Sequence, residues 1–229
     1  MNNSGNGFKG ERMKSIAVLN YGSGNIFSLN NALKYIGVEI EVISCPTDMN
    51  RFDKFVLPGV GAFGSCMKML DETGFADEIV KQSATGKTFL GICVGMQVFF
   101  ERSHEFGCHK GLGFFSGEIG RLPLVDDLNN SILAPHIGWA PLCLKPSPKI
   151  SSPMLSLLSS LDEDAEYYFI HSFVARPKDP GICMAECSYS GIPFTAIAGA
   201  NNILGVQFHP EKSGEAGLDF LRRWATAEF

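Results

Sequence analysis

Cys93 is the side chain of this sequence that is best placed to act as a nucleophile. It stands at the centre of a Gly-x-Cys-x-Gly sequence, residues 91–95, which follows a short apolar run. Met96, Phe99 and Phe100 come next with the spacing of one helix face, so the pattern predicts a buried strand that turns sharply into a helix. This is the cysteine counterpart of the nucleophile elbow, in which glycines relieve a strained turn. Cys93 would then lie at a helix N-terminus, which favours a thiolate. The alternative to a nucleophile is an inert buried cysteine beside two packing glycines.

A histidine and a glutamate near the end of the chain could serve this thiol. His209 and Glu211 follow the segment 203–208, which predicts a strand, and in an extended segment their side chains point the same way. A thiol nucleophile needs a base within hydrogen-bond reach, and the base needs an acceptor that orients it. Only the fold can bring His209 to Cys93. His171, which also follows a strand-like segment, stays open as a second possible base.

Two glycines flank one residue at the end of another predicted strand. In the sequence Pro58-Gly59-Val60-Gly61 the backbone is free enough to turn an N–H group into a cavity. Such a donor suits an oxyanion hole, which stabilises the negative charge that develops in a transition state. The residues alone fit an ordinary strand-to-helix turn equally well.

Strands and helices alternate along the first half of the chain and predict an α/β fold. Apolar runs at 16–19, 55–57 and 88–92 are separated by helical patterns. We expect a doubly wound, mostly parallel central sheet flanked by helices, with an additional small antiparallel strand region later in the chain. The elbow then lies at the carboxyl ends of the strands, where such sheets bind ligands. The glycine turn at 21–25 lacks the third glycine of G-x-G-x-x-G, so it does not favour dinucleotide binding.

The composition indicates one globular domain. With 229 residues, 45% of them apolar and 19% charged, we expect one domain at 14–229 after a disordered lead at 1–13. A net charge of −5 without a Lys/Arg cluster disfavours nucleic acid and anionic membranes. No apolar run is long enough for a bilayer span or a signal peptide. Seven cysteines without a C-x-x-C pair indicate reduced thiols in the cytoplasm, and we expect no metal or cofactor.

The motifs around Cys93 and His209 together resemble a known family. Residues 91–97 with 207–211 resemble the triad-type glutamine amidotransferases. Further motifs narrow the resemblance to the glutaminase subunits of imidazole glycerol phosphate synthase, an enzyme of histidine biosynthesis; they lie at residues 20–25, 58–63, 135–139, 171–173 and 210–213. The resemblance covers nearly the whole chain.

The resemblance implies hydrolysis of L-glutamine through a covalent thioester at Cys93. His209, oriented by Glu211, keeps Cys93 reactive and protonates the leaving ammonia. The backbone amides of Val60 and Val94 are the implied oxyanion donors, and the first can rest turned away. The residues implied to contact substrate are Gly59, Gly61, Gln97, His171, Ser172 and Phe173.

The resemblance also implies a heterodimer with a (β/α)₈-barrel synthase subunit. That subunit uses the ammonia to form imidazole glycerol phosphate and aminoimidazole carboxamide ribonucleotide. Residues implied at the interface are Asn20, Asn25, Trp139 and Lys212. Relatives commonly have Asp at position 20 and Asn at position 140, where this chain has Asn20 and Ala140. A paralogous glutaminase for a sugar amidotransferase in surface-polysaccharide biosynthesis therefore stays open, as do a non-catalytic scaffold and a hydrolase acting alone.

Overall fold

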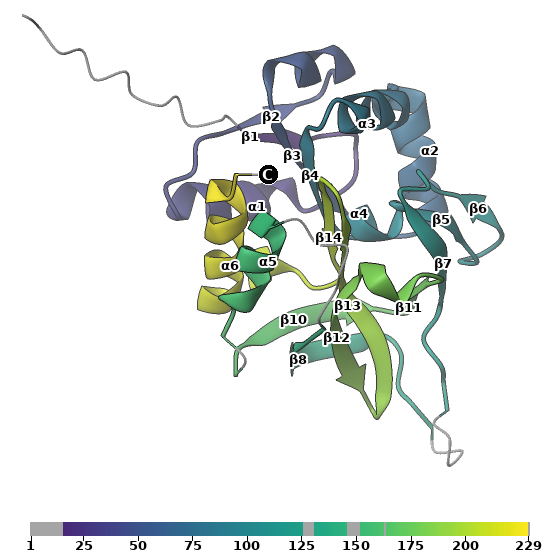
Figure 1. The fold of residues 1–229 in the computed structure, drawn as a ribbon. Helices are drawn as coiled ribbons and strands as arrows, with labels where there is room; N and C mark the ends of the chain where they lie inside the picture. Colours follow the sequence, from purple (N-terminus) through teal and green to yellow (C-terminus); the bar gives the residue numbers. More distant parts are fainter. Residues whose placement is uncertain (1–15, 126–130, 146–151, 163, 229) are drawn as a thin grey trace, which may run out of the picture.

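A computed structural model describes residues 16–125, 131–145, 152–162 and 164–228 of the chain. Within these residues one large sheet and one small sheet form the centre of the molecule (Figure 1). The large sheet contains β1 (Ile16–Leu19), β2 (Ile40–Ile43), β3 (Lys54–Gly59), β4 (Thr88–Cys93), β5 (Phe100–Ser103), β6 (His109–Lys110), β7 (Phe115–Arg121), β9 (Cys143–Leu144), β11 (Phe173–Pro177), β12 (Cys183–Tyr189), β13 (Ile192–Ala200) and β14 (Ile203–Val206). The small sheet pairs β8 (His136–Pro141) with β10 (Glu166–His171).

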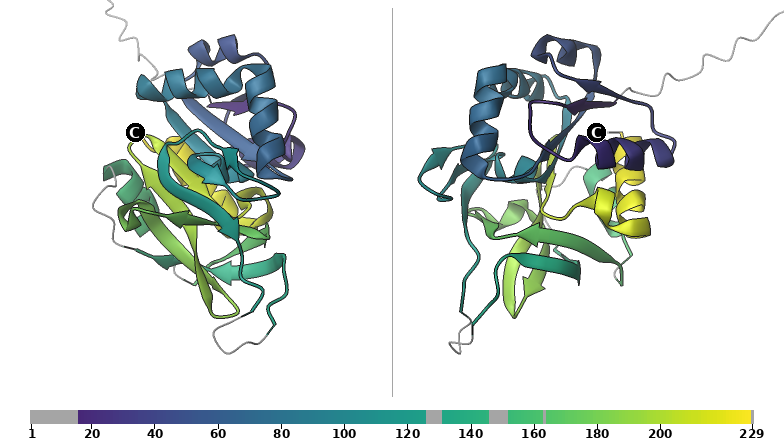
Figure 2. Two further views of the ribbon diagram at one scale, coloured as in Figure 1. Left: turned by 90° about the vertical axis from the view of Figure 1, so that its right-hand side faces the viewer. Right: turned by 180° about the vertical axis from the view of Figure 1, so that it is seen from behind.

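Helices cover both faces of the large sheet. They are α1 (Ile26–Tyr35), α2 (Phe63–Thr73), α3 (Phe75–Ala84), α4 (Val94–Gln97), α5 (Ser152–Ser159) and α6 (Gly214–Thr226). Helices α1, α5 and α6 lie on one side of the strands, and α2 and α3 lie on the other (Figures 1 and 2). The predicted N-terminal lead at 1–13 lies outside the described residues.

Five neighbouring strands form a parallel centre in the order β2-β1-β3-β4-β14. Every residue of β1, β3, β4 and β14 is buried. Strands covered on both faces need apolar side chains on both faces, which is why they read as continuous apolar runs in the sequence. The predicted doubly wound sheet is confirmed.

Beyond β14 the large sheet continues mainly with antiparallel neighbours. β13 pairs antiparallel with β14, β12 and β11, and β11 pairs antiparallel with β7. The small β8–β10 sheet is antiparallel as well. The antiparallel region that the sequence predicts is therefore present, and it extends the large sheet itself as well as forming the small one.

The helix predicted after Cys93 is much shorter than its apolar spacing indicated. α4 ends at Gln97, and Phe100 already belongs to β5, where it pairs with Phe115 of β7. Phe99 and Phe100 both pack edge-on against the Phe115 ring, so they are buried by a turn into a strand rather than by a helix face. The prediction of Phe99 and Phe100 as helical residues was wrong.

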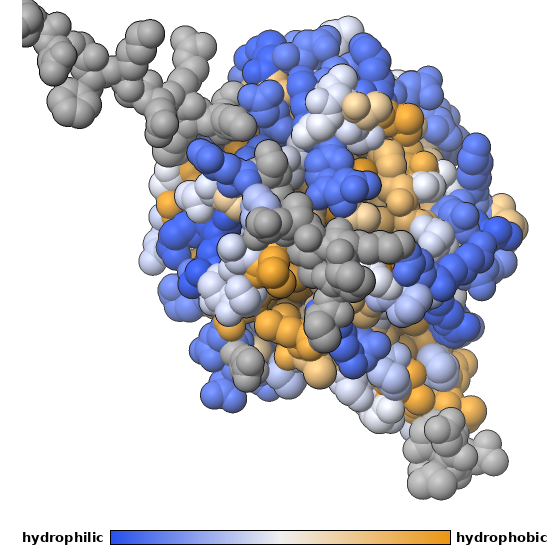
Figure 3. Space-filling model, in the orientation of Figure 1, coloured by the Kyte–Doolittle hydropathy of each residue, from blue (hydrophilic) through white to orange (hydrophobic). Residues whose placement is uncertain are grey.

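The surface of the molecule is mixed in hydropathy. Hydrophilic side chains cover most of the face drawn in Figure 3, and apolar residues reach it in smaller areas. None of the helices in the part of the chain that the structure describes is long and apolar enough to cross a membrane.

Candidate active site

Cys93 lies at the turn between β4 and α4 in a backbone conformation that non-glycine residues rarely adopt. Its φ is +55° and its ψ is −112°. A Cβ atom on Gly95 would lie 1.9 Å from the Leu57 carbonyl oxygen, and one on Gly91 would lie 2.5 Å from the Gly95 carbonyl oxygen. The backbone of α4 therefore packs directly on β3 and β4. These contacts hold the turn in its strained form and present the thiol at its apex.

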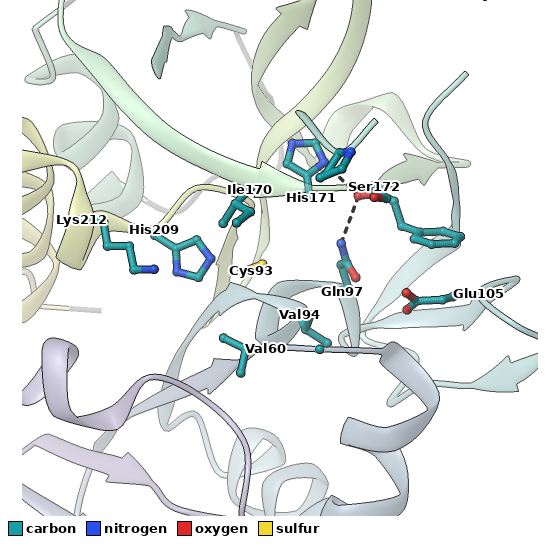
Figure 4. A pocket seen from close by; sticks show the side chains of 13 residues that line it. Val60, Cys93, Val94, Gln97, Glu105, Ile170, His171, Ser172, His209 and Lys212 are labelled. Atoms are coloured by element: carbon teal, nitrogen blue, oxygen red, sulfur yellow. Dashed lines mark hydrogen bonds between the residues drawn. The ribbon is translucent and has the colours of Figure 1, made fainter. Parts of the chain in front are cut away.

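The strand that leads to the base lies beside the strand that ends in the thiol. β14 pairs in parallel with β4, with Val206 opposite Ile92, and the chain continues from there to His209. His209 Nδ1 donates a hydrogen bond of 2.8 Å to Glu211 Oε1, and both side chains are almost fully buried. The His209 ring and the Cys93 thiol line the same cavity. Figure 4 shows the ring beside Cys93 at one end of a pocket.

Burial and hydrogen bonding act on the pKa of His209 in opposite directions. Burial lowers it, because the charged imidazolium loses its water. The neighbouring Cys93 and Glu211 groups outweigh burial and raise the pKa of His209 above its ordinary value. The ring is therefore protonated at neutral pH beside the Cys93 sulfur, and an imidazolium next to a thiol is the arrangement that activates cysteine in thiol enzymes.

A cavity of about 330 Å³ opens at Cys93 (Figure 4). The predicted site residues that line it are Val60, Gly61, Cys93, Val94, Gln97, His171, Ser172, Phe173, His209 and Lys212. Gly59 and Glu211 line a much smaller neighbouring cavity. The sequence reasoning missed Glu105, whose carboxylate lines the main cavity and accepts a 2.7 Å hydrogen bond from the Phe63 amide. No motif surrounds Glu105, so the sequence carries no signal for it.

The backbone amide of Val60 is engaged by a serine from the glycine turn that follows β1. Val60 N donates to Ser23 Oγ over 3.2 Å, and Ser23 Oγ donates back to the Val60 carbonyl oxygen over 2.9 Å. Ser23 is buried, and its hydroxyl also contacts the Cys66 sulfur at 3.3 Å. In this conformation the Val60 N–H is satisfied within the protein and is not available to an oxyanion.

Gln97 is a buried residue of the cavity wall and not a solvated helix residue. Its Nε2 donates to the Phe173 carbonyl oxygen over 3.2 Å and to Gln207 Oε1 over 3.0 Å. Gln207 in turn donates from Nε2 to Cys93 Sγ over 3.7 Å. Sequence reasoning missed Gln207, because a glutamine within a strand-end motif has no spacing that distinguishes it from a packing residue.

The second candidate base, His171, belongs to a buried pair of histidines. His171 Nδ1 lies 3.1 Å from the Phe173 carbonyl oxygen, and His171 Nε2 lies 3.3 Å from His136 Nδ1. Because the carbonyl oxygen only accepts, His171 Nδ1 carries the proton and Nε2 accepts from His136. Burial lowers the pKa of His171 to about 3 and that of His136 to about 4. Both rings are neutral at physiological pH.

The residues predicted at the partner interface have different environments. Trp139 is half exposed on β8, and the Lys212 ammonium lies 5.8 Å from the centre of the Tyr168 ring. Asn25 caps α1 by accepting a 3.3 Å hydrogen bond from the Ser28 amide, whereas Asn20 Nδ2 donates to Ser44 Oγ over 3.0 Å. Ala140 is buried, so its side chain does not face outward.

The described residues contain no cluster of side chains suited to a metal ion. No group of three or more His, Cys, Asp or Glu side chains in these ranges could hold a metal ion. All seven cysteines lie within the described residues and are free thiols.

The chain matches known proteins over nearly its whole length. The family model "Glutamine amidotransferase class-I" matches residues 17–226. The imidazole glycerol phosphate synthase subunit HisH of Geobacter metallireducens is 39% identical over 94% of this chain and 100% of its own. Subunit HisH 1 of Legionella pneumophila (strain Lens) is 38% identical over 93% of this chain and 99% of its own. A glutamine amidotransferase crystal structure shares the fold, with a TM-score of 0.67 and 19% identity over 91% of this chain and 97% of that one. The chain therefore belongs to the class-I glutamine amidotransferase family and, within it, to the group of the HisH subunits of imidazole glycerol phosphate synthase.

Proposed function

We propose that this chain is the glutaminase subunit of imidazole glycerol phosphate synthase and that Cys93, His209 and Glu211 carry out its chemistry. The observation that carries the proposal is that one cavity is lined by a strained, strand-end cysteine and by a histidine that a buried carboxylate orients. Nucleophile, base and orienting group are the parts that covalent catalysis by a thiol requires.

The reaction begins when Cys93 Sγ attacks the side-chain amide carbon of glutamine. The carbonyl oxygen becomes an oxyanion, and the leaving nitrogen takes a proton from the His209 imidazolium and departs as ammonia. The carbon then carries a thioester to Cys93. Water attacks the thioester, His209 takes a proton from that water, and the sulfur leaves as glutamate is released.

The cavity offers recognition groups for both ends of the substrate. Glu105 places a carboxylate in the wall, which suits the α-ammonium group of glutamine. The Gln97 amide and the backbone of Ser172 and Phe173 lie on the same wall and suit the remaining polar groups. Val94 follows Cys93 directly and supplies the oxyanion donor on the α4 side.

The resting state of the Val60 amide gates the reaction. Its N–H group is held by Ser23, so the oxyanion hole lacks one donor until the Gly59-Val60-Gly61 loop rearranges. Loss of one oxyanion donor costs about 10²–10³ in turnover. Binding of a partner near the Ser23 turn favours the rearranged loop, because a partner shifts a two-state equilibrium toward the state that it binds better.

Ammonia from this site reaches its acceptor directly. Free ammonia is mostly protonated at neutral pH and reacts poorly, so hydrolysis must be coupled to a second active site. For this group of proteins we infer a heterodimer with a (β/α)₈-barrel synthase subunit in the cytoplasm. The half-exposed Trp139 and the cavity-lining Lys212 are the residues that we assign to that interface.

Steady-state glutamine hydrolysis by the purified chain tests this proposal. We expect low activity alone and stimulation of at least about 10²-fold when the barrel subunit and its nucleotide ligand are added. Cys93→Ala abolishes hydrolysis, while the barrel subunit still turns over with added ammonium salts. A glutamine-analogue electrophile labels Cys93 and spares the other six cysteines.

Each alternative has its own outcome in the same assay. Full glutaminase activity of the chain alone would reject the gating by the Val60 loop and support a hydrolase that acts without a partner. Stimulation by a sugar amidotransferase but not by the barrel subunit keeps the mechanism and changes the pathway. Labelling mainly at other cysteines ends the assignment of Cys93, and absence of hydrolysis under every condition supports a non-catalytic scaffold.

A further inference from the structure

Gln207 is a fully buried polar residue that the mechanism above does not use. Its side chain lies directly after β14, and its backbone N–H donates to the Ala196 carbonyl oxygen over 2.8 Å, which holds the residue in register. Its Nε2 lies 3.7 Å from Cys93 Sγ. The Gln207 amide therefore contacts the sulfur from inside the protein, while the His209 ring lies beside Cys93 in the cavity (Figure 4).

The direction of the Gln207 amide is fixed by its neighbours. The Phe173 carbonyl oxygen can only accept a hydrogen bond, so the Gln97 group that faces it is Nε2. The second N–H of the same Nε2 reaches Gln207 Oε1. With its oxygen occupied in this way, Gln207 presents its N–H to the sulfur. Reversing both amides would set the Gln97 oxygen against the carbonyl oxygen, which is unfavourable.

The hydrogen bonds of these groups therefore have a fixed direction. Gln97 donates to the Phe173 carbonyl oxygen and to Gln207, and Gln207 donates to the sulfur. A hydrogen bond donated to sulfur stabilises the thiolate more than the thiol, because an ionised acceptor forms the stronger bond. The amide differs from the imidazolium in one respect. His209 gives up its proton to the leaving ammonia, whereas Gln207 cannot lose its own at neutral pH. The amide can therefore hold the sulfur in place through both steps.

We infer that Gln207 is a further catalytic residue, which donates to Cys93 Sγ, and that Gln97 is a positioning residue, which acts through Gln207. This inference rests on the proposed role of Cys93 as the nucleophile. Gln97 would then have two tasks, since it also lines the substrate cavity.

The test is the pH dependence of Cys93 alkylation by iodoacetamide, followed by peptide mass spectrometry in the full chain without glutamine. In Gln207→Leu we expect the midpoint at Cys93 to move up by about one pH unit, and kcat with the partner present to fall about 10-fold with little change in KM. The exposed thiols Cys45 and Cys108 serve as internal references and keep their wild-type profiles.

Gln82→Leu is the matched control, because Gln82 is a buried glutamine on α3 that bonds Asn50 and Glu78 rather than Cys93. It accounts for the general effect of replacing a buried amide. Gln97→Met removes the hydrogen bond that orients the Gln207 amide, so we expect a smaller upward shift of the alkylation midpoint at Cys93. This variant keeps the inference testable if Gln207→Leu does not fold.

The failure of this inference can be told from that of the proposed function. If Cys93 is alkylated with a wild-type profile and kcat is unchanged in folded Gln207→Leu and Gln97→Met, Gln207 is only a packing residue. If Cys93→Ala retains glutamine hydrolysis, the nucleophile assignment fails and the role of Gln207 fails with it.

Discussion

His209 follows β14 and His171 is the last residue of β10, and their neighbours give the two rings different proton affinities. His209 has a thiol and a carboxylate as neighbours, and they raise its pKa against the effect of burial. His171 is packed against a second imidazole and bonds a backbone carbonyl, and burial lowers its pKa to about 3. A ring that stays neutral and has both nitrogens engaged is poorly suited to carry protons near pH 7.

Replacement of each histidine by asparagine tests this difference. In His209→Asn we expect kcat with the partner present to fall by about 10²–10⁴, the usual span for loss of a general acid–base group. We expect a smaller fall of kcat in His171→Asn, because this change removes a packing and hydrogen-bonding residue of the cavity wall and no proton carrier. His104→Asn, at an exposed position, keeps full activity. A larger loss in His171→Asn than in His209→Asn would reverse the assignment.

The sequence predicts Cys93, His209 and Glu211 as the reacting group, but not every polar side chain that surrounds the cavity. Cys93 and His209 stand in motifs whose spacing predicts a turn or a strand end, so their roles can be proposed from the sequence alone. Ser23, Glu105 and Gln207 act through contacts between segments far apart in the chain. Nothing in their own neighbours along the sequence distinguishes them from ordinary polar residues.

At the scale of elements, the loop after β3 depends on the glycine turn after β1. These two strands are parallel neighbours, so their carboxyl ends lie side by side and Ser23 reaches Val60. Tyr21 adds a 2.7 Å hydrogen bond from its hydroxyl to the Pro58 carbonyl oxygen. A change in the glycine turn therefore directly affects the loop that carries the proposed oxyanion donor, the Val60 amide.

Removal of the Ser23 hydroxyl is expected to loosen the resting loop. In Ser23→Ala the Val60 N–H loses its acceptor, which destabilises the resting conformation by about one hydrogen bond, or about 0.5–1.5 kcal/mol. Glutamine hydrolysis by the chain alone then rises about 2- to 10-fold, while the rate with partner and ligand changes little. Ser65→Ala, at an exposed serine of α2, is the control. Unchanged or lower activity of a folded Ser23→Ala chain would exclude a restraining role for Ser23.

The elements differ in how far the sequence predicts them. Buried parallel strands such as β3 and β4 appear as apolar runs, and their order follows from the alternation with helices. The single turn of α4 was not predictable, because Phe99 and Phe100 are spaced for a helix face and only the packing against Phe115 shows that they enter a strand. The antiparallel pairings of β11 to β13 depend on long-range register, which local patterns do not contain.

At the scale of the whole molecule, the two neutral histidines link stability to pH. Ring stacking surrounds His136 with Phe169 and Tyr189, at centroid distances of 5.2 and 4.2 Å. The unfolded chain binds protons at both histidines below about pH 6.5, whereas the folded chain resists protonation until about pH 4 at His136 and about pH 3 at His171. The unfolded state thus binds more protons in this window, so the free energy of unfolding falls as the pH falls from about 6.5 to about 4.

Urea unfolding at several pH values between 7 and 4.5 measures this linkage. We expect the free energy of unfolding of the wild type to decrease over the range, and the decrease to be smaller in His136→Phe, whose ring fits the aromatic stack without titrating. Ser65→Ala, at an exposed position without a titratable side chain, keeps the wild-type slope. Equal slopes in wild type and His136→Phe would show that His136 does not contribute.

The place of β14 in the sheet has a consequence for how the enzyme is made. β14 is the last of the described strands along the chain, yet it fills the position between β4 and β13. During synthesis the N-terminal part emerges and begins to fold first. A nascent chain that already exposes the thiol at the end of β4 has no base beside it until β14 has been inserted. Incomplete chains are therefore expected to lack glutaminase activity, and ammonia production begins only once β14 has paired with β4 and β13.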